Sequence, residues 1–324
     1  MISLPWRARP RGGILALASS EDTLRYVLAS SSDERGATLE SWGIEGRGYQ
    51  TREAFAKRLK AALPRAGRVI AVLDPQQYQI LQLEAPNVPP GELKSAVRWQ
   101  MMEFLEGSPH DYTLDVMSVP GAPPAPGKAI AVAAHNDVVR ELMLACERLG
   151  RPLSVIDVCE TAQRNLLQAV LAAEPEAPAV AAALVADARR ALLVVSVDGQ
   201  LQFFRRFEFD TDMVAAPVDE TQQALIGEGA GAEAATRSLT QLHRSLDLWD
   251  DSHPHMPLGT LRVEAGIKTA AIVERLRPDV GVDTRALNLS GLFKVPSAEA
   301  NPPWLDTGYL PLLGALLRPV EAPR

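Results

Sequence analysis

Hydrophobic and polar positions follow the same succession of periods in two separate parts of the chain. In the first part, alternating runs predict strands at Gly13–Ser19, Leu24–Ser30, Thr38–Ile44 and Val69–Leu73, with an amphipathic helix at Arg52–Leu63. In the second part, they predict strands at Ala181–Ala186, Ala191–Val197, Leu201–Phe209 and Leu261–Glu264, with a helix at Ala232–Trp249. Both parts follow the order β-β-β-α-β. The pattern therefore predicts an α/β protein built from two similar halves.

The segment between these halves, Gln79–Leu149, has its own pattern. It predicts a strand, a helix over Gly91–Leu105, two strands at Tyr112–Ser118 and Lys128–Ala134, and a helix at Asn136–Leu149. The Pro- and Gly-rich run Pro120–Gly127 predicts a loop, because neither residue type continues a helix or strand. We therefore expect a first half at 1–78, an inserted subdomain at 79–150 and a second half at 151–324.

The predicted helix Gly91–Leu105 has two apolar faces. One face carries Leu93, Val97, Met101 and Phe104 at helical spacing, which is typical of a core stripe. Trp99 and Met102 point away from that stripe. A second apolar face indicates either a helix that packs between two layers or a docking surface, since Trp and Met are enriched at interfaces. The sequence leaves both interpretations open.

Composition narrows the class of protein. The chain has 324 residues, 47% apolar and 23% charged, with a formal net charge of -7. Mixed charge without clustered Lys and Arg argues against nucleic acid as the partner. Two cysteines in apolar surroundings, Cys146 and Cys159, fit buried thiols in a reducing compartment. The N-terminus has no long apolar core, and no window provides the roughly 20 apolar residues of a membrane helix. We expect a soluble, cytoplasmic protein that only a partner holds at a membrane.

Common catalytic motifs give little support to an enzyme. The sequence has no Gly-x-Ser-x-Gly, no Cys/His pair and no P-loop lysine. The run His253-Pro254-His255, close after Asp250 and Asp251, could suggest a metal site. An exposed loop that leaves a helix is the favoured interpretation, because no distant third ligand is visible. We therefore predict no metal site and no catalytic residue.

One region resembles a known family. The run that begins Asp74-Pro75-Gln76-Gln77-Tyr78 and continues into a helix with Arg98-Trp99-Gln100-Met101 resembles the MshI/PilM family of pilus-assembly proteins. The resemblance extends to Ala181–Trp249 and to Leu312–Arg318. It implies the actin-like fold, with two RNase H-like halves, an inserted α/β subdomain and a C-terminal helix that returns to the first half. The same superfamily includes the cytoplasmic domain of type II secretion protein L.

The resemblance also implies a function. Such a protein is a cytoplasmic scaffold of type IV pilus assembly, of the mannose-sensitive haemagglutinin (MSHA) type for MshI, recruited to the inner-membrane face. It binds the cytoplasmic tail of a PilN-like inner-membrane protein, and the assembly ATPase is a further candidate partner. For that tail, we predict apolar contacts at Trp99 and Met102 and a charge contact at Arg98. The alternative is an active actin-like ATPase or a sugar-kinase-like enzyme that hydrolyses Mg-ATP.

The nucleotide loops expected from this resemblance are degenerate. The first, near Ala18–Asp22, has no glycine and no preceding Asp. The second keeps Asp187 but has Arg189 where the family has glycine, and the family's Gly-Gly turn is reduced to Glu264-Ala265-Gly266. Glycine matters there because it lets backbone N–H groups approach phosphates. We therefore expect a vestigial cofactor site at Asp187, Arg189 and Gly266, with no required cofactor and at most weak binding of Mg-ATP. A turn residue is the structural alternative for Asp187.

Overall fold

The chain divides into two compact units. The computed structural model describes residues 13–19, 23–33, 36–46, 48, 54, 57–58, 60, 66–89, 91–119, 127–148, 150–151, 153–217, 230–296 and 301–318. Unit 1 comprises residues 1–33 and 37–159, and unit 2 comprises residues 34–36 and 160–324. The predicted helix Arg52–Leu63 and the tip of the first loop, Ser20–Asp22, lie largely outside the described residues. The domain limits given above and the return of the C-terminal helix to the first half stay predictions.

Unit 1 contains a sheet whose strands follow the order β3-β2-β1-β4-β8. These strands are β1 (Gly13–Ser19), β2 (Thr23–Asp33), β3 (Gly36–Gly46), β4 (Ala66–Val72) and β8 (Leu153–Asp157). β1 runs antiparallel to β2 and parallel to β4, and β4 runs parallel to β8. Each predicted strand of the first half is present, with ends that differ by up to three residues.

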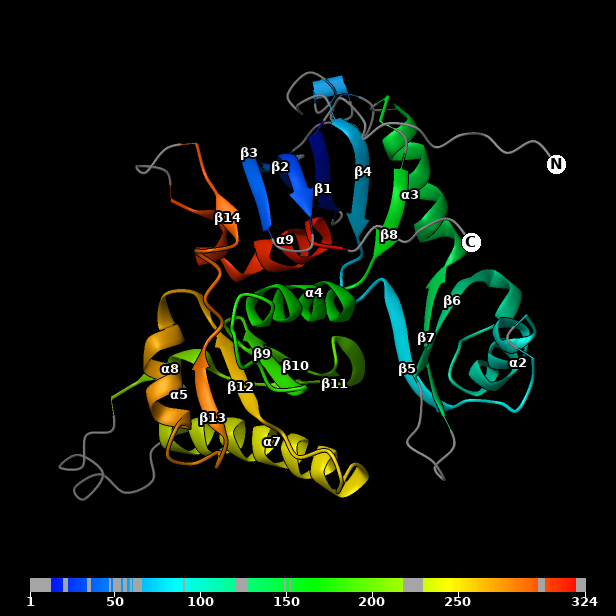
Figure 1. Ribbon diagram of the computed structural model, residues 1–324. Helices are drawn as coiled ribbons and strands as arrows, with labels where there is room; N and C mark the ends of the chain where they lie inside the picture. The colour runs from blue at the N-terminus through cyan, green and yellow to red at the C-terminus, as the bar shows by residue number, and fades with distance from the viewer. Residues whose placement is uncertain are drawn as a thin grey trace. The chain divides into compact units, whose positions relative to one another are not determined.

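A smaller α/β subdomain is inserted between β4 and β8 (Figure 1). Its antiparallel sheet has the order β5-β7-β6, formed by β5 (Tyr78–Glu84), β7 (Lys128–His135) and β6 (Tyr112–Val119). Its helical elements are α2 (Leu93–Gln100), the short 3₁₀ turns η1 (Met101–Glu103) and η2 (Pro109–Asp111), and α3 (Asn136–Arg148). The Pro120–Gly127 loop lies outside the described residues apart from Gly127.

Unit 2 repeats the topology of the unit 1 sheet, with strand order β11-β10-β9-β12-β13. The strands are β9 (Val180–Ala186), β10 (Arg190–Val197), β11 (Gln200–Glu208), β12 (Thr260–Glu264) and β13 (Asp283–Ala286). The first three form an antiparallel meander, while β12 lies parallel to both β9 and β13. The predicted Asp198-Gly199 turn is confirmed, because both residues have positive φ, +48° and +75°, as a type I′ hairpin requires.

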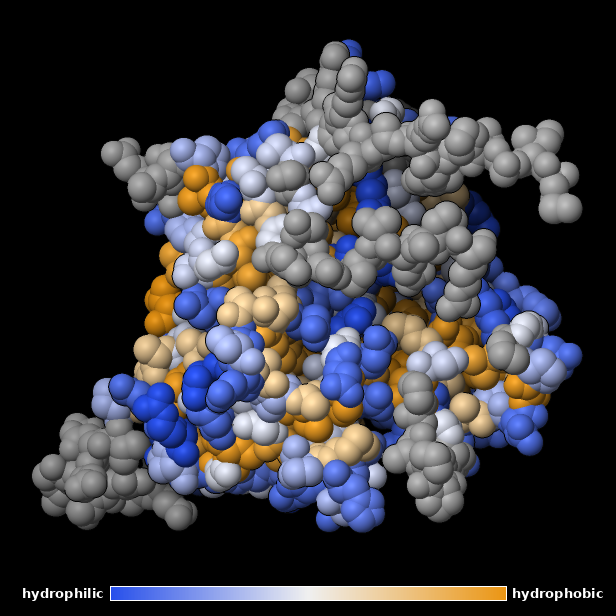
Figure 2. Space-filling view, viewed as in Figure 1, coloured by the Kyte–Doolittle hydropathy of each residue, from blue (hydrophilic) through white to orange (hydrophobic). Residues whose placement is uncertain are grey.

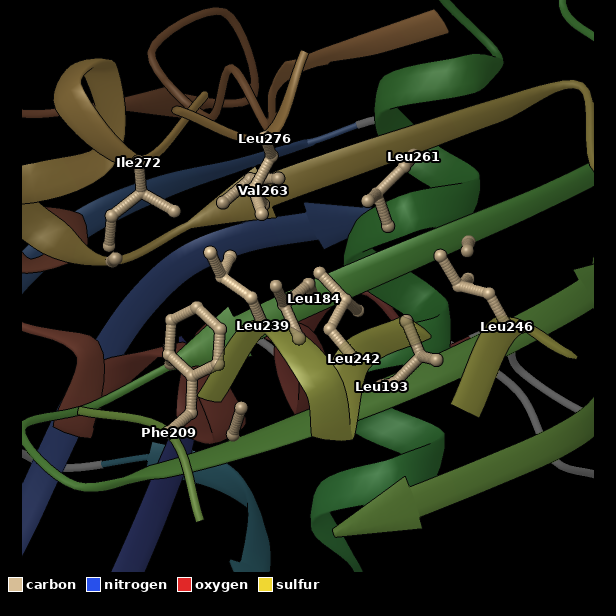
Figure 3. Close-up of a cluster of buried hydrophobic side chains, with 14 of the residues drawn as sticks. Leu184, Leu193, Phe209, Leu239, Leu242, Leu246, Leu261, Val263, Ile272 and Leu276 are labelled. Carbon is tan, nitrogen blue, oxygen red and sulfur yellow. The ribbon is translucent and has the colours of Figure 1, made fainter. Parts of the chain in front are cut away.

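The core of unit 2 lies between its sheet and three helices, α5 (Thr211–Ala215), α7 (Ala230–Ser252) and α8 (Thr269–Leu276). Figure 3 shows side chains of both layers meeting there, such as Leu184 and Leu193 from the sheet and Leu242 from α7. Leu261 and Val263 alternate with Thr260, Arg262 and Glu264 along β12. Since only the first two join this core, the other three point to the opposite face.

The opposite face of the unit 2 sheet contacts α4 (Cys159–Leu171), which the sequence analysis did not predict. Gln163 Nε2 donates to the carbonyls of Ala183 and Leu192, both at 2.8 Å, so the side chain joins α4 to β9 and β10. The C-terminal helix α9 (Leu310–Leu316) packs on α4. At their contact, a Cβ added to Gly314 would lie 2.1 Å from the carbonyl oxygen of Ala162.

Candidate functional site

Two predicted loops meet at the carboxyl edge of the unit 2 sheet. Strands β9 and β12 are parallel, and Glu264 pairs with Val185. Asp187 and Gly266 each follow two residues later, so the segments after β9 and β12 leave the sheet at the same edge. In open α/β sheets, ligands bind outside the carboxyl ends of the strands. The structure therefore brings together the second loop, Asp187–Arg189, and the turn Glu264–Thr269, here called the 264–269 turn.

Asp187 has the geometry of a residue that closes a hairpin. Its Oδ1 accepts hydrogen bonds from the backbone N–H groups of Arg189 at 3.2 Å and Arg190 at 3.0 Å, and its own N–H donates to the Arg190 carbonyl at 2.9 Å. These contacts match the turn-residue interpretation of Asp187. They also give Oδ1 two donors from within the loop.

Arg189 does not need to be glycine in this loop. Among the described residues, Asp198 is the only non-glycine residue with positive φ, so Arg189 has an ordinary backbone conformation. The loop carbonyls are also occupied, since Ala188 O accepts from Thr211 N at 3.2 Å and Arg189 O accepts from Phe209 N at 3.0 Å. The second loop is thus held against the segment that leads into α5.

Thr211 connects the second loop to the 264–269 turn. Its Oγ1 lies 3.4 Å from Ala188 O and accepts a hydrogen bond from Lys268 Nζ at 3.0 Å. Lys268 Nζ also lies 2.7 Å from Asp212 Oδ1, so the cation of this turn already has an anionic partner. Lys268 belongs to the 3₁₀ turn η3 (Gly266–Lys268). Sequence reasoning missed Thr211, Asp212 and Lys268, because only the tertiary fold brings α5 to this edge.

Gly266 fits its position for two reasons. Its φ is +62°, a conformation that glycine adopts at little cost, and an added Cβ would lie 2.8 Å from the carbonyl oxygen of Leu305. Leu305 is the last residue of the 3₁₀ turn η4 (Pro303–Leu305). The structure thus explains this glycine by packing within unit 2, and a role in cofactor binding stays a prediction.

The edge of the unit 1 sheet is organised by the motif that begins at Asp74. Gln76 N donates to Asp74 Oδ1 at 3.0 Å, Asp74 N donates to Gln77 Oε1 at 2.8 Å, and Gln77 Nε2 donates to Ser19 O at 3.3 Å. Tyr78 adds a hydroxyl that accepts from Cys159 N at 3.1 Å. This distinctive run therefore forms a turn that connects the end of β4 to the end of β1 and to Cys159, all within unit 1.

Helix α2 ends earlier than the sequence pattern predicts, which changes its core face. Val97 and Met101 are fully buried, but the prediction that Phe104 belongs to the core is wrong, because its side chain is 51% exposed. The α-helix stops at Gln100 and the chain turns through η1, so helical spacing no longer applies beyond Met101. Leu105, which is 8% exposed, joins Val97 and Met101 in the core instead.

Three apolar side chains, Trp99, Met102 and Phe104, form what we call the α2–η1 surface. Their exposed fractions are 62%, 42% and 51%, so α2 is not packed between two layers. Figure 2 shows hydrophobic atoms on the viewed face over the region of α2. The neighbouring Arg98 has a structural task, since its Nη1 donates to the carbonyls of Pro109 at 2.6 Å and Tyr112 at 3.0 Å.

The His253 region lies at the other edge of the unit 2 sheet. The ring of His253 stacks on Trp249 with centroids 3.9 Å apart, and its Nδ1 lies 3.2 Å from Trp249 O. Asp250 and His253 contribute to the lining of a cavity of about 370 Å³, together with Leu246, Pro254 and Leu258. Within the part of the chain that the structure describes, no three His, Cys, Asp or Glu side chains are grouped as a metal would require.

The described helices place one limit on membrane association. None of those within the described ranges combines the length and the apolar character that crossing a bilayer requires.

The repeated five-stranded topology, with a subdomain inserted in the first unit, defines an actin-like fold. No protein-family model matches the chain, and no curated protein matches it. A solved structure described as a PilM-PilN type IV pilus biogenesis complex is similar in fold, with a TM-score of 0.68 and 20% identity. The match covers 97% of this chain and 100% of that chain.

A second solved structure is the cytoplasmic domain of EpsL, an inner-membrane component of the type II secretion system of Vibrio cholerae. It has a TM-score of 0.47 and 10% identity, over 94% of each chain.

Proposed function

We propose that this chain is a cytoplasmic scaffold of a type IV pilus or related assembly system, at the inner-membrane face. The proposal is supported by the actin-like fold shared with the chain of the PilM-PilN complex over nearly the whole of both chains. The finer assignment, a scaffold of the MSHA type that belongs with MshI, is part of the same proposal and rests on the sequence motif that begins at Asp74.

The partner in this proposal is the cytoplasmic tail of a PilN-like inner-membrane protein, and the α2–η1 surface receives it. The observation that carries this assignment is the exposure of Trp99, Met102 and Phe104 within six consecutive residues. Large apolar side chains that cluster on a surface are the usual anchors of a peptide interface. Because Arg98 Nη1 is engaged inside the subdomain, the apolar contacts carry the expected affinity.

The test compares Trp99→Ala with the matched variant Met143→Ala, which also truncates an exposed apolar residue of unit 1. A synthetic peptide of the N-terminal tail of a PilN-like protein is titrated into each protein by calorimetry. We expect Trp99→Ala to lose about 2 kcal/mol of binding free energy, roughly a 30-fold weaker affinity, with a change in stability within about 0.5 kcal/mol. Met143→Ala should bind like the parent protein. Equal affinity of a folded Trp99→Ala protein would place the tail elsewhere.

The degenerate nucleotide site is the second part of the proposal. Two of the polar groups that could face Mg-ATP are already engaged within unit 2, since Asp187 Oδ1 accepts from two backbone donors and Lys268 pairs with Asp212. We expect steady-state ATP turnover at background level in the parent protein. Measurable turnover that disappears in Asp187→Ala would instead support the alternative, an active ATPase or sugar-kinase-like enzyme.

A further inference from the structure

Glu264 is a buried carboxylate in the 264–269 turn that the proposed function does not use. It is the last residue of β12 and only 8% exposed. Its Oε1 accepts the backbone N–H of Gly266 at 2.8 Å and lies 2.9 Å from the hydroxyl of Thr269. One carboxylate oxygen therefore accepts hydrogen bonds from a backbone N–H and a side-chain hydroxyl of the same turn.

The hydroxyl of Thr269 completes this small network. It accepts a hydrogen bond from Ala265 N at 2.9 Å. Its single proton has two possible acceptors, since the hydroxyl oxygen lies 2.9 Å from Glu264 Oε1 and 2.7 Å from Gly266 O. The N–H groups of Ala265 and Gly266 and the hydroxyl of Thr269 thus have acceptors within the turn. In contrast, a turn of this kind at the carboxyl edge of a sheet offers its donors to a ligand when no internal acceptor is present.

The charged groups on the elements around Glu264 have other partners. Lys268 in the turn pairs with Asp212 of α5, and Arg262, on the same face of β12, pairs with Glu174 at 2.5 Å. On the η4 side, Asp306 accepts the N–H of Gly308 at 2.9 Å. Burial raises the pKa of Glu264 to about 7, while the hydrogen bonds from Thr269, Gly266 and Ala265 oppose that rise.

We propose that Glu264 is a built-in ligand of the 264–269 turn, whose carboxylate excludes the phosphate or ribose oxygens of a nucleotide from the donors of Gly266 and Thr269. This assigns to Glu264 the role of a specificity-determining residue in a site that resembles a nucleotide site in its topology. The inference does not depend on the partner of the α2–η1 surface, so the peptide experiment and the one below can fail independently.

The test follows the amide chemical shifts of Gly266 and Thr269 by NMR during addition of Mg-ADP at millimolar concentration. Glu264→Ser shortens the side chain and frees the N–H of Gly266, whereas Glu264→Gln keeps an acceptor oxygen at the same reach. Glu274→Ala removes an exposed charge from α8, the helix that begins at Thr269, and serves as the control. We expect saturable shifts of both amides in Glu264→Ser only.

Two results would overturn the proposal. One is an equal response of the parent protein and Glu264→Ser, and the other is a folded Glu264→Ser protein whose two amides do not respond. A second measurement covers the case in which Glu264→Ser does not fold. In the parent protein, the Gly266 amide shift should change with pH around an inflection near 7, and this inflection should be absent in Glu264→Gln. A Gly266 amide profile that is the same in the parent protein and in Glu264→Gln would overturn the proposal.

Discussion

The α2–η1 surface and the 264–269 turn differ in whether their functional groups are exposed or have partners inside the protein. At the α2–η1 surface, Trp99, Met102 and Phe104 are exposed, although Val97 and Met101 beside them are fully buried. At the 264–269 turn, the carboxylate, hydroxyl and ammonium groups of Glu264, Thr269 and Lys268 all have partners inside unit 2. An open apolar surface costs little if a partner covers it, whereas polar groups that are satisfied internally have little to offer a ligand. This contrast is the reason why we propose protein binding rather than nucleotide chemistry.

The largest expected effect is a difference in stability between alanine variants of two neighbouring residues, one on the buried face of α2–η1 and one on its exposed face. Met101→Ala removes a fully buried side chain and should lower the free energy of unfolding by about 3 kcal/mol, because it leaves a cavity. Met102→Ala truncates a side chain that is 42% exposed and should change stability by no more than about 0.5 kcal/mol. Chemical denaturation of both variants measures the difference. Similar losses would mean that Met102 belongs to the core.

A second prediction tests how tightly the 264–269 turn is built. In Gly266→Ala, the new Cβ lies on a residue with positive φ and would be 2.8 Å from the carbonyl oxygen of Leu305. In Gly281→Ala, φ is also positive, at +72°, but no atom lies within 4 Å of the new Cβ. We expect Gly281→Ala to cost about 1 kcal/mol from backbone strain alone, and Gly266→Ala to cost roughly 1 kcal/mol more. Thermal unfolding of the pair gives both values. If the two costs are equal, η4 does not press on the turn.

A third prediction concerns pH. Since burial raises the pKa of Glu264 from 4.5 to about 7, the folded state holds this proton more tightly than the unfolded state. Its contribution to stability is fully present below pH 4.5 and is lost as the pH rises through 7. Glu264→Gln should remove this loss, which we expect to be about 3 kcal/mol, because one pKa unit corresponds to about 1.4 kcal/mol. Unfolding free energies of both proteins between these pH values measure it, and parallel curves would contradict the shift.

Much of the fold could be predicted from the sequence because the strands are short and alternate regularly. β1 has the predicted ends, and the Asp198-Gly199 hairpin follows from the demand of a type I′ turn for positive φ. Helix α4 could not be predicted in this way. Its buried residues include Glu160, Gln163 and Asn165, whose polar side chains erase the amphipathic pattern that identifies a helix. They are tolerated because distant partners satisfy them, as Ala183 O and Leu192 O do for Gln163.

For the candidate sites too, features set by local sequence could be predicted and features set by distant contacts could not. The position of Trp99 away from Val97 could be predicted from helical spacing, but its exposure could not, because a helix packed between two layers gives the same pattern. The local role of Asp187 could also be predicted, as an Asp that bonds to backbone groups two and three residues ahead. The contacts of Thr211 and Lys268 join residues 57 positions apart, and no short-range pattern contains that information.

The contact between α9 and α4 has a consequence for how unit 2 folds. Asn165 Nδ2 donates to Gly314 O at 3.0 Å across 149 positions of sequence, and Gly314 is the residue whose lack of a side chain lets the two helices touch. Contacts between such distant residues form slowly, because a long loop must close before they contribute any stability. During synthesis, α4 therefore emerges long before the helix that covers it. We expect its apolar side chains to be accessible to chaperones for most of that time, and the docking of α9 to be among the last steps of folding.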